Sequence, residues 1–461
     1  RSQELGEALG ELCEEAGDYG PDGEGLGLER RLDDAARESE LWPKVKRLLT
    51  ELHAQVEGLA KKLSVEVKES FPDFAEKGGA ALDRELAGAV AELQEHSALL
   101  AELLEEPPHP SRCYSALVRV DRGTWTLTAQ PVDVSGFFKE QLAKSKRALV
   151  LTSATLTAGE RSPWVLERLG MKPDLTGARA KAKAEAAKAE PAISDAARAE
   201  AATGEAEKKE ELVPRFLRAR TPFDLPRQAL VILVTDAPKP RDEAAFVDWA
   251  AHKISGLAQF MGGRVLGLFA SSRRLERVGE KVRATLEPMG IEVLRQSRGH
   301  GRTLAARQEQ DAGSVLLGTR SFWQGVDIPG LGVGLVFIDK LPIEPQSRPI
   351  VAAREERYAG TGKGFLGFAK YRLPRALLML RQGVGRLIRS HQDRGIVVIA
   401  DPGHPSYRGE VLAALEGYRV EALPWDQARV RIFHALKAMG LEAKSRVRPA
   451  PRSDAGGPNA A

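Results

Sequence analysis

Cysteine is scarce in this chain of 461 residues. Cys13 and Cys113 are the only two, and neither belongs to a CxxC pair. Their number and spacing exclude a disulfide framework, a zinc site and a four-cysteine iron–sulfur cluster within the chain. We therefore expect reduced thiols and a cytoplasmic protein, because disulfides are rare in that compartment.

Long apolar runs and a strong net charge are also missing. No run has the length of a membrane-spanning helix, and the first residues, RSQELGEALGELCEE, lack the basic-then-apolar order of a signal peptide. We expect no membrane partner. The 68 basic and 64 acidic residues leave a net charge of +4, which permits nucleic-acid binding through local patches without arguing for it. Because position 1 is arginine, we expect the gene to begin further upstream.

Motifs that hold phosphate or magnesium are absent as well. A P-loop needs GxxxxGK followed by Ser or Thr, and the nearest string, AGTGKG at 359–364, places Gly364 where the hydroxyl should be. We interpret that string as a flexible loop. Asp242 and Glu243 follow a Pro-Arg pair rather than an apolar strand, which indicates a helix start instead of a DEAH-like box. The lack of a Gly-rich dinucleotide turn and of a His-based triad argues against a small-molecule enzyme.

The first 106 residues carry a helical pattern. Apolar residues recur every three to four positions from Trp42 to Leu63 and again from Leu82 to Leu103, which predicts two long antiparallel helices. Three prolines between 107 and 110 end this region. Beyond it, Ser115–Val120 and Thr124–Thr128 flank a turn and predict a β-hairpin.

The second half of the chain alternates apolar strands with helices, which predicts an α/β fold with an open parallel sheet and helices on both faces. The predicted strands are Leu230–Val234, Val265–Ala270, Glu292–Leu294, Val315–Gly318, Leu335–Ile338 and Ile396–Ala400. The predicted helices include Glu243–Phe260, Arg274–Leu286 and Pro374–Gln382. An earlier run, Ala148–Thr152 (ALVLT), is also predicted to be a strand buried on both faces of a sheet.

Polar clusters follow four of the apolar runs. They are SAT at Ser153–Thr155, ASSRR at 270–274, TRSFWQGVDIPG at Thr319–Gly330 and DPGHP at Asp401–Pro405. Open parallel sheets bind ligands beyond the carboxyl ends of their strands, so these clusters stand where a functional edge would be. Each cluster alone could equally be an ordinary turn.

The most informative segment is RQGVGRLIRS at Arg381–Ser390. Gln382, Arg386 and Arg389 are spaced by four and three residues, so on a helix they would share one face. Two permanently charged guanidinium groups side by side suit a transferring phosphoryl group, whose negative charge spreads over several oxygens. A solvated basic helix start is the plainer alternative for an isolated RxxR.

These motifs, in this order and together with DKLPIEPQSRP at Asp339–Pro349, resemble the carboxyl-terminal half of the DinG/XPD-like helicases of superfamily 2. The resemblance covers about 115–175 and 216–415. It implies two RecA-like domains that grip ATP between them, with a helical arch inserted in the first. It also implies the following division: arch-like region 1–110, end of the first RecA-like domain 111–174, second RecA-like domain 216–441. The Ala/Lys/Glu-rich residues 175–215 are expected to be an insertion, and 442–461 a disordered tail.

The resemblance also implies roles for residues. Arg386 and Arg389 would be arginine fingers that reach ATP on the first domain, and Gln382 would help orient the phosphate. Gly325 and Asp327 would lie near the nucleotide, and Ser153, Ala154 and Thr155 would couple hydrolysis to movement. Thr319 and the Ser271–Ser272 loop would face the DNA backbone. Trp323 is compatible with stacking on a base or with packing in the core.

The implied function is ATP-dependent translocation on single-stranded or forked DNA and duplex unwinding, in repair or replication, with a 5′ to 3′ direction. The cofactor would be ATP with Mg²⁺, held mostly by a first RecA-like domain in cis or in trans, and the chain alone is expected to be inactive. The alternative is a non-catalytic nucleic-acid-binding or regulatory protein that kept this fold. Gly403 comes after Asp401, where members of the family more often have an arginine. Arg408 is a candidate to supply the contact that this arginine would make.

Overall fold

The computed structural model describes residues 2–15, 27–70, 79–143, 149–153, 164–171, 221–239, 242–296, 313–323, 333–359, 364–401 and 403–443. The chain divides into two compact units. The first comprises Arg1–Thr157, Arg161–Arg220 and Glu344–Pro374, and the second comprises Ala158–Glu160, Thr221–Ile343 and Arg375–Ala461. Residues 344–374 thus cluster with the first unit, although the sequence placed them inside a single domain at 216–441.

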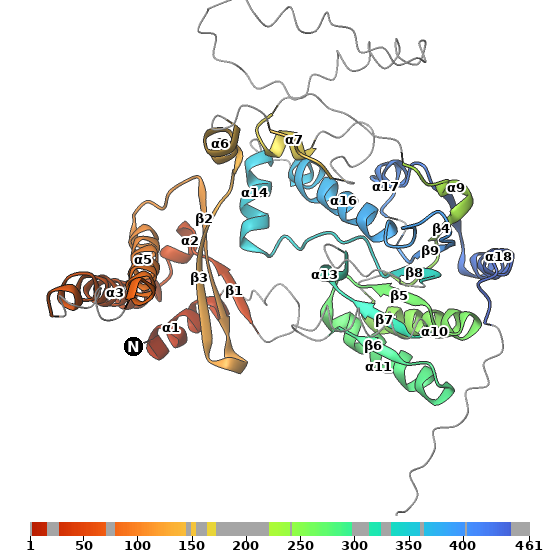
Figure 1. Cartoon of the computed structure of the whole chain (residues 1–461), viewed down its shortest axis with the longest axis horizontal. Coiled ribbons are helices and arrows are strands. Elements are labelled where there is room, and N and C mark those ends of the chain that lie inside the picture. Colours follow the sequence, from red (N-terminus) through yellow and green to blue (C-terminus); the bar gives the residue numbers. More distant parts are fainter. Residues whose placement is uncertain are drawn as a thin grey trace, which may run out of the picture. The chain divides into compact units, whose positions relative to one another are not determined.

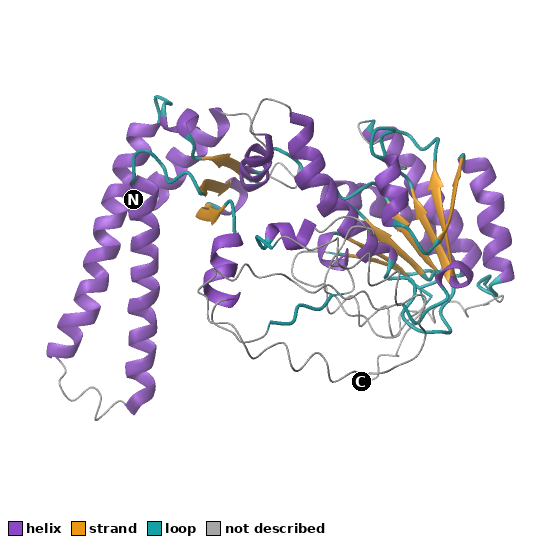
Figure 2. Ribbon diagram, turned by 90° about the horizontal axis from the view of Figure 1, so that it is seen from above, coloured by secondary structure: helices purple, strands orange, loops and turns teal. Residues whose placement is uncertain are grey.

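Two long helices dominate the first unit, as the apolar periodicity predicted. They are α3 (Trp42–Ser70) and α5 (Gly79–Leu104), and Figure 2 shows them lying side by side. With α1 (Ser2–Glu15) they enclose a core in which Leu9, Leu49 and Leu103 are fully buried, and the short helix α2 (Asp34–Arg37) precedes α3. Burying each such side chain contributes about 1.5–3 kcal/mol.

The first unit also contains a three-stranded antiparallel sheet in the order β1-β2-β3. Its strands are β1 (Leu28–Arg31), β2 (Arg112–Arg119) and β3 (Thr124–Pro131), and a 3₁₀ turn at Val120–Arg122 joins β2 to β3. The predicted hairpin is therefore confirmed. Strand β1 was not predicted, because LERR carries no apolar alternation and gains its conformation from pairing with β2.

The guanidinium group of Arg37 joins the helices to this sheet. It donates hydrogen bonds to the carbonyl oxygens of Leu32 (3.3 Å), Leu103 (3.1 Å) and Glu105 (2.6 Å). The same group lies 5.1 Å from the ring centre of Trp42. Two of the three carbonyls belong to the end of α5, where helix carbonyls have no partner within the helix.

Replacing Arg37 by lysine should destabilise the first unit by about 1–2 kcal/mol, because one ammonium group cannot reach the three carbonyls in this fork geometry. The measurement is the urea midpoint of unfolding, and Arg47→Lys on the exposed side of α3 is the matched control. Equal midpoints for the two variants would show that the Arg37 contacts contribute nothing.

The remaining elements of the first unit are short, except for α14. They are α6 (Ser135–Phe137), a π-helical turn (Phe138–Ala143), α7 (Trp164–Arg168), α14 (Pro349–Ala359), α15 (Gly364–Gly367) and a second π-helical turn (Phe368–Arg372). Helix α14 is tied to β1 by an ion pair between Arg31 and Glu356 at 2.7 Å. An ion pair between the half-buried Arg372 and the buried Glu355, at 3.0 Å, ties it to the second π-helical turn.

The prediction of a buried strand at Ala148–Thr152 is wrong for the part that the structure describes. Residues 149–153 form no strand, and the side chain of Val150 is 84% exposed. An apolar strand is buried only if neighbouring strands and helices cover it. The sheet β1-β2-β3, which is the one described in this unit, does not include this segment.

The second unit is built on a seven-stranded sheet in the order β10-β4-β9-β8-β5-β7-β6, and all neighbouring strands are parallel. The predicted α/β fold with an open parallel sheet is therefore confirmed. The strands are β4 (Ala229–Val234), β5 (Val265–Leu268), β6 (Val293–Arg295), β7 (Val315–Gly318), β8 (Leu335–Ile338), β9 (Gly395–Ile399) and β10 (Arg419–Leu423).

Helices cover both faces of this sheet, as Figure 1 shows. On one face, α10 (Glu243–Met261), α11 (Ser272–Leu286) and α18 (Trp425–Ala438) form a single apolar core with alternate strand residues. The other face carries α13 (Arg320–Trp323), α16 (Leu373–Val384) and α17 (Arg408–Ala414). Short helical segments complete the unit: α9 (Leu225–Gln228) and a 3₁₀ turn (Glu287–Met289).

Two smaller predictions can also be compared with the structure. Asp242 is the N-cap of α10 and accepts a hydrogen bond from the Ala245 N–H at 3.4 Å, so the helix start is confirmed. Among the described helices, none combines the length and the apolar composition needed to cross a bilayer. The whole of the expected insertion at 175–215 lies outside the described residues, as do most of the tail at 442–461 and residues 360–363 of AGTGKG.

Candidate functional site

Three of the four polar clusters meet at one edge of the parallel sheet. The register pairs Leu268 with Gly318 and with Ile338, and Ile338 with Ile399, so the carboxyl ends of β7, β5, β8 and β9 lie next to one another in that order. The loops that follow begin with Thr319 after β7, Phe269 after β5, Asp339 after β8 and Ala400 after β9. The sequence therefore located this edge correctly.

A buried ion pair joins two of these loops. Arg274 Nη1 lies 3.1 Å from Asp339 Oδ2, and the two side chains are 6% and 0% exposed. Asp339 also accepts hydrogen bonds from the N–H groups of Ala270 (2.9 Å) and Lys340 (2.7 Å). Burial raises the pKa of Asp339 above its ordinary value, and the guanidinium group and the N–H donors oppose that shift.

Sequence reasoning missed this pair. A signal was available, because Asp339 directly follows a fully apolar strand and Arg274 falls on the apolar stripe of α11 beside Leu275 and Val278. Its guanidinium group lies 4.8 Å from the ring centre of Phe246. The pair fixes the loop after β5, which contains Ser271 and Ser272, relative to the loop after β8.

The Ser271–Ser272 loop is also the start of α11. Ser271 is the N-cap, and its hydroxyl oxygen accepts a long hydrogen bond from the Arg274 N–H at 3.5 Å. Ser272 is the first residue of the helix, and both serines are half-buried. Both serines therefore keep some solvent exposure at the sheet edge, while the N-cap and the Arg274–Asp339 pair fix the backbone there.

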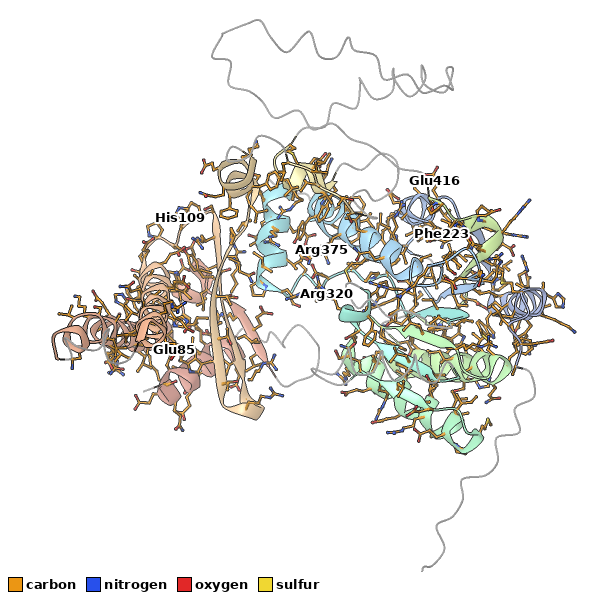
Figure 3. All side chains as sticks on the ribbon, in the orientation of Figure 1. Glu85, His109, Phe223, Arg320, Arg375 and Glu416 are labelled. Atoms are coloured by element: carbon orange, nitrogen blue, oxygen red, sulfur yellow. The ribbon has the colours of Figure 1, made fainter. Side chains whose placement is uncertain are left out.

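Thr319 is held in place from the neighbouring strand β6. Gln296 Oε1 accepts hydrogen bonds from the Thr319 N–H at 2.7 Å and from its hydroxyl at 3.0 Å. Gln296 directly follows β6 and was not singled out from the sequence. After Thr319 the chain turns at once into α13, whose first residue, Arg320, is labelled in Figure 3.

The segment RQGVGRLIRS is not one helix. Helix α16 ends at Val384, so Gln382 is helical, Arg386 lies in a following turn and Arg389 lies in a bend. The expectation that all three share a helical face is therefore wrong. Asp393 Oδ2 accepts hydrogen bonds from the N–H groups of Arg389 (2.8 Å) and Ser390 (2.7 Å), which competes with helical hydrogen bonding.

This bend is anchored further by a buried side chain at the end of α9, directly before β4. Gln228 Nε2 donates to the carbonyl oxygens of Ser390 at 2.9 Å and Asp393 at 3.0 Å. Sequence reasoning identified neither Gln228 nor Asp393 as part of the segment. The guanidinium-bearing residues Arg386 and Arg389 are both half-buried, so their positions are set by the protein while part of each side chain stays accessible.

Arg386 also contacts the strand-end motif directly. Its Nη2 donates a hydrogen bond to the carbonyl oxygen of Trp323 at 2.9 Å. Trp323 is fully buried, so stacking on a base is excluded in this structure and the alternative of core packing is confirmed. A Cβ on Gly383 would lie 2.8 Å from Trp323 Cε3, which explains why this helical position is glycine.

The loop after β9 explains why glycine stands at position 403, where the resemblance implied an arginine. Asp401 accepts hydrogen bonds from the N–H groups of Leu341 (3.2 Å) and Gly403 (3.1 Å). Gly403 has φ of +82°, a left-handed conformation that strains any residue with a Cβ. Arginine at this position would be unfavourable, so the turn itself accounts for the glycine.

For five of the predicted site residues the structure gives no position relative to this edge. Ser153 is exposed and belongs to the first unit. Ala154, Thr155, Gly325 and Asp327 lie outside the described residues.

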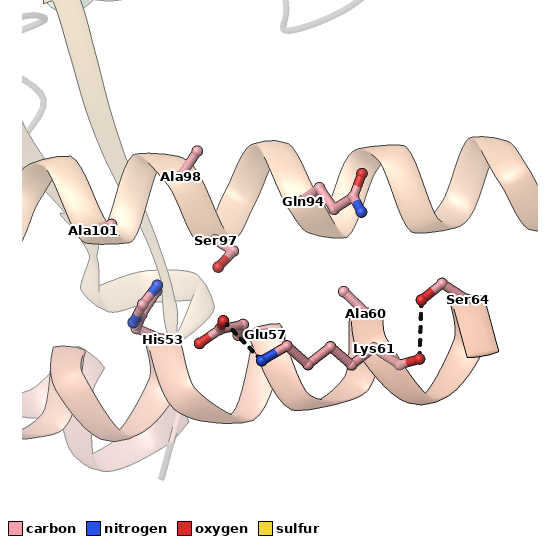
Figure 4. Close-up of a pocket in the computed structure, with 9 residues that line it drawn as sticks. All are labelled: His53, Glu57, Ala60, Lys61, Ser64, Gln94, Ser97, Ala98 and Ala101. Carbon is pink, nitrogen blue, oxygen red and sulfur yellow. Dashed lines mark hydrogen bonds and ion pairs between the residues drawn. The ribbon is translucent and has the colours of Figure 1, made fainter. Parts of the chain in front are cut away.

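A separate cavity of about 350 Å³ lies between α3 and α5 (Figure 4). Its lining is mixed, with Glu57 and Lys61 paired at 3.3 Å on α3 and Gln94 and Ser97 on α5. None of the residues predicted from the motifs lines it.

Both cysteines are buried, and burial raises the pKa of Cys113 to about 11, so its thiol stays protonated near neutral pH.

Comparisons with known proteins show similarity to helicases. Residues 254–416 match the family model described as the helicase C-terminal domain. The chain is 34% identical over 201 residues to the ATP-dependent helicase DinG of Mycobacterium tuberculosis (strain ATCC 25177 / H37Ra), covering 43% of this chain and 30% of that protein. It is 30% identical over 277 residues to the ATP-dependent DNA helicase YoaA of Escherichia coli (strain K12), covering 60% and 36%.

A third relative carries a different description. The chain is 28% identical over 277 residues to the 3'-5' exonuclease DinG of Bacillus subtilis (strain 168), covering 59% of this chain and 26% of that protein. The matches thus span between 26% and 36% of the length of these three curated relatives.

Proposed function

We propose that the chain is the carboxyl-terminal portion of an ATP-dependent DNA helicase of the DinG/XPD-like type, because residues 254–416 match the helicase C-terminal domain model and the chain is similar to the helicases DinG and YoaA. The whole enzyme would couple ATP hydrolysis to movement on single-stranded DNA and to the unwinding of duplexes. The observation that carries this proposal is the fixed position of Arg386 beside the strand-end motif, with its guanidinium group bonded to the Trp323 carbonyl. We further propose a cytoplasmic location and a role in repair or replication.

In this proposal Arg386 and Arg389 are the arginine fingers of the nucleotide site. The loose transition state of phosphoryl transfer spreads charge over the equatorial oxygens, and a guanidinium group stabilises that charge without needing protonation. The backbone at Arg389 is fixed by Asp393 and Gln228, and the side chain of Arg386 is held by the Trp323 carbonyl, so little reorganisation is needed on binding. Gln382, Gly325 and Asp327 would complete this half of the site, and Gln382 would orient the phosphate.

The other half of the nucleotide site would lie on a first RecA-like domain with a P-loop, in cis or in trans. Mg²⁺ bound there with ATP would neutralise charge on the phosphate oxygens. The sequence of this chain contains no P-loop, so the phosphates would be held mainly by that other domain. Residues 111–174 would be the end of the first RecA-like domain, and Ser153, Ala154 and Thr155 would couple hydrolysis to movement.

The sheet edge would contact the DNA backbone. Ser271 and Ser272 follow β5 and Thr319 follows the adjacent strand β7, and hydroxyl and N–H groups at such positions bind phosphate oxygens without reading base sequence. The Thr319 N–H and hydroxyl both donate to Gln296, so Thr319 would contact a phosphate by exchanging one of these hydrogen bonds. That suits an enzyme that moves along a strand. The long helices within 1–110 would form the arch-like region.

The test uses the full-length enzyme, meaning this chain together with the P-loop domain. We expect it to unwind a duplex with a 5′ single-stranded tail in the presence of ATP and Mg²⁺, and to leave a 3′-tailed duplex intact. A full-length protein that binds single-stranded DNA but shows no ATP turnover would instead support the alternative, a non-catalytic nucleic-acid-binding or regulatory protein.

A further inference from the structure

We propose that Trp323 is a positioning residue that holds Arg386, and with it the end of α16, against the strand-end segment that begins at Thr319. This inference rests on the proposed function, because it assigns Trp323 a role in ATP turnover through the arginine finger. The segment concerned runs from the end of β7 through α13, entirely within the second unit.

The first step is the contact between Trp323 and the helix that precedes Arg386. A Cβ on Gly383 would lie 2.8 Å from Cε3 and 2.9 Å from Cζ3 of Trp323, and 3.1 Å from Leu268 Cδ1. The indole ring therefore lies directly on the backbone of α16, beside the last residue of β5. Close packing of this kind transmits a displacement, because protein interiors have little free volume.

The second step is polar. The Trp323 carbonyl accepts the hydrogen bond from Arg386 Nη2 at 2.9 Å. The Trp323 ring thus contacts Gly383, and the Trp323 carbonyl holds Arg386, which lies three residues further along the chain. A charged donor makes this hydrogen bond stronger than one between neutral groups.

The third step links this contact to the sheet edge. Trp323 is the last residue of α13, a helix of four residues that begins directly after Thr319. The adjacent Phe322 is 1% exposed, and its N–H donates to the Thr319 carbonyl oxygen at 2.8 Å. Thr319 is itself held by Gln296 at 2.7 Å. A short, closely packed series of contacts therefore connects Thr319, a proposed DNA contact, to Arg386, a proposed arginine finger.

The experiment measures ATP turnover by the full-length enzyme carrying Gly383→Ala, with saturating single-stranded DNA. The new methyl group must displace the indole ring, and alanine is otherwise favourable inside a helix. We expect kcat to fall about tenfold to a hundredfold, because a misplaced reacting group loses that much. The KM for ATP and the dissociation constant for single-stranded DNA should change less than kcat.

Two further variants change Trp323 itself instead of the glycine that it contacts. Trp323→Phe keeps a flat ring but loses the part of the indole that carries Cε3 and Cζ3, so kcat should fall by less than in Trp323→Leu. Trp323→Leu removes the ring and should lower kcat as Gly383→Ala does. Gly256→Ala in α10 is the matched control, because an added Cβ there meets nothing within 4 Å.

A double variant separates positioning from a merely structural role. In an Arg386→Lys background, which keeps a positive charge but loses the fixed geometry, Gly383→Ala should cause little further loss if Trp323 acts through Arg386. Full turnover by Gly383→Ala and Trp323→Leu, or losses that multiply in the double variant, would overturn the inference. Absence of ATP turnover in the wild-type enzyme would instead contradict the proposed function.

Discussion

Replacing Arg386 by alanine in the full-length enzyme is expected to abolish ATP turnover, with a loss on the order of 10³-fold or more, while single-stranded DNA binding is largely retained. The guanidinium group would no longer stabilise charge on the transferring phosphoryl group. DNA binding should persist because Thr319 and the Ser271–Ser272 loop are held by Gln296 and by the Arg274–Asp339 pair, neither of which involves Arg386 in the described contacts.

The measurement is steady-state ATP hydrolysis with and without single-stranded DNA, together with a DNA-binding titration. Arg227→Ala is a suitable control, because its side chain is 87% exposed and its recorded partner is Asp224 on the surface. Arg386→Lys should recover little activity, since lysine lacks the planar fork of donors. Turnover that survives Arg386→Ala would show that this residue is not an arginine finger.

Replacing Asp339 by alanine is expected to destabilise the second unit by about 3–5 kcal/mol, because Arg274 would remain buried without its counter-ion. The Ala270 and Lys340 N–H groups would lose their acceptor as well. The cost should appear as a lower urea midpoint of unfolding. The loop after β5 should also become more accessible to hydrogen exchange, because Asp339 is what connects it to β8.

A surface ion pair provides the comparison. Lys281 and Asp248 are 2.9 Å apart with side chains 55% and 67% exposed, so Asp248→Ala should change stability by less than about 0.5 kcal/mol. Replacing both Arg274 and Asp339 by apolar residues of similar volume should cost far less than Asp339→Ala alone. If Asp339→Ala were as mild as Asp248→Ala, the buried pair would not be what fixes these loops.

The parallel sheet could be predicted from sequence because its strands are continuous apolar runs that end at polar residues. Val315–Gly318 and Leu335–Ile338 have the predicted bounds. Strand β10 was missed, since RVEAL at an edge position mixes charged and apolar residues and depends on β4 for its conformation. ALVLT fails for the opposite reason: its composition suits a buried strand, but the described part of the first unit provides no strand beside it.

The site was predictable in its location more than in its internal geometry. Polar residues after apolar strands indicated the edge that carries Ser271 and Thr319. The bend at Arg389 depends on Asp393, four residues further on, and on Gln228, which is distant in sequence; no local pattern reveals the second contact. The Arg274–Asp339 pair joins residues 65 positions apart, so it becomes visible only once the strand order is known.

The central claim is that this chain carries half of a nucleotide site. The most direct measurement is ATP hydrolysis by the purified chain in the presence of Mg²⁺ and single-stranded DNA, before and after addition of the P-loop domain. We expect no turnover by the chain alone, and turnover that depends on Arg386 once the P-loop domain is present. Sustained ATP hydrolysis by the chain alone would contradict it.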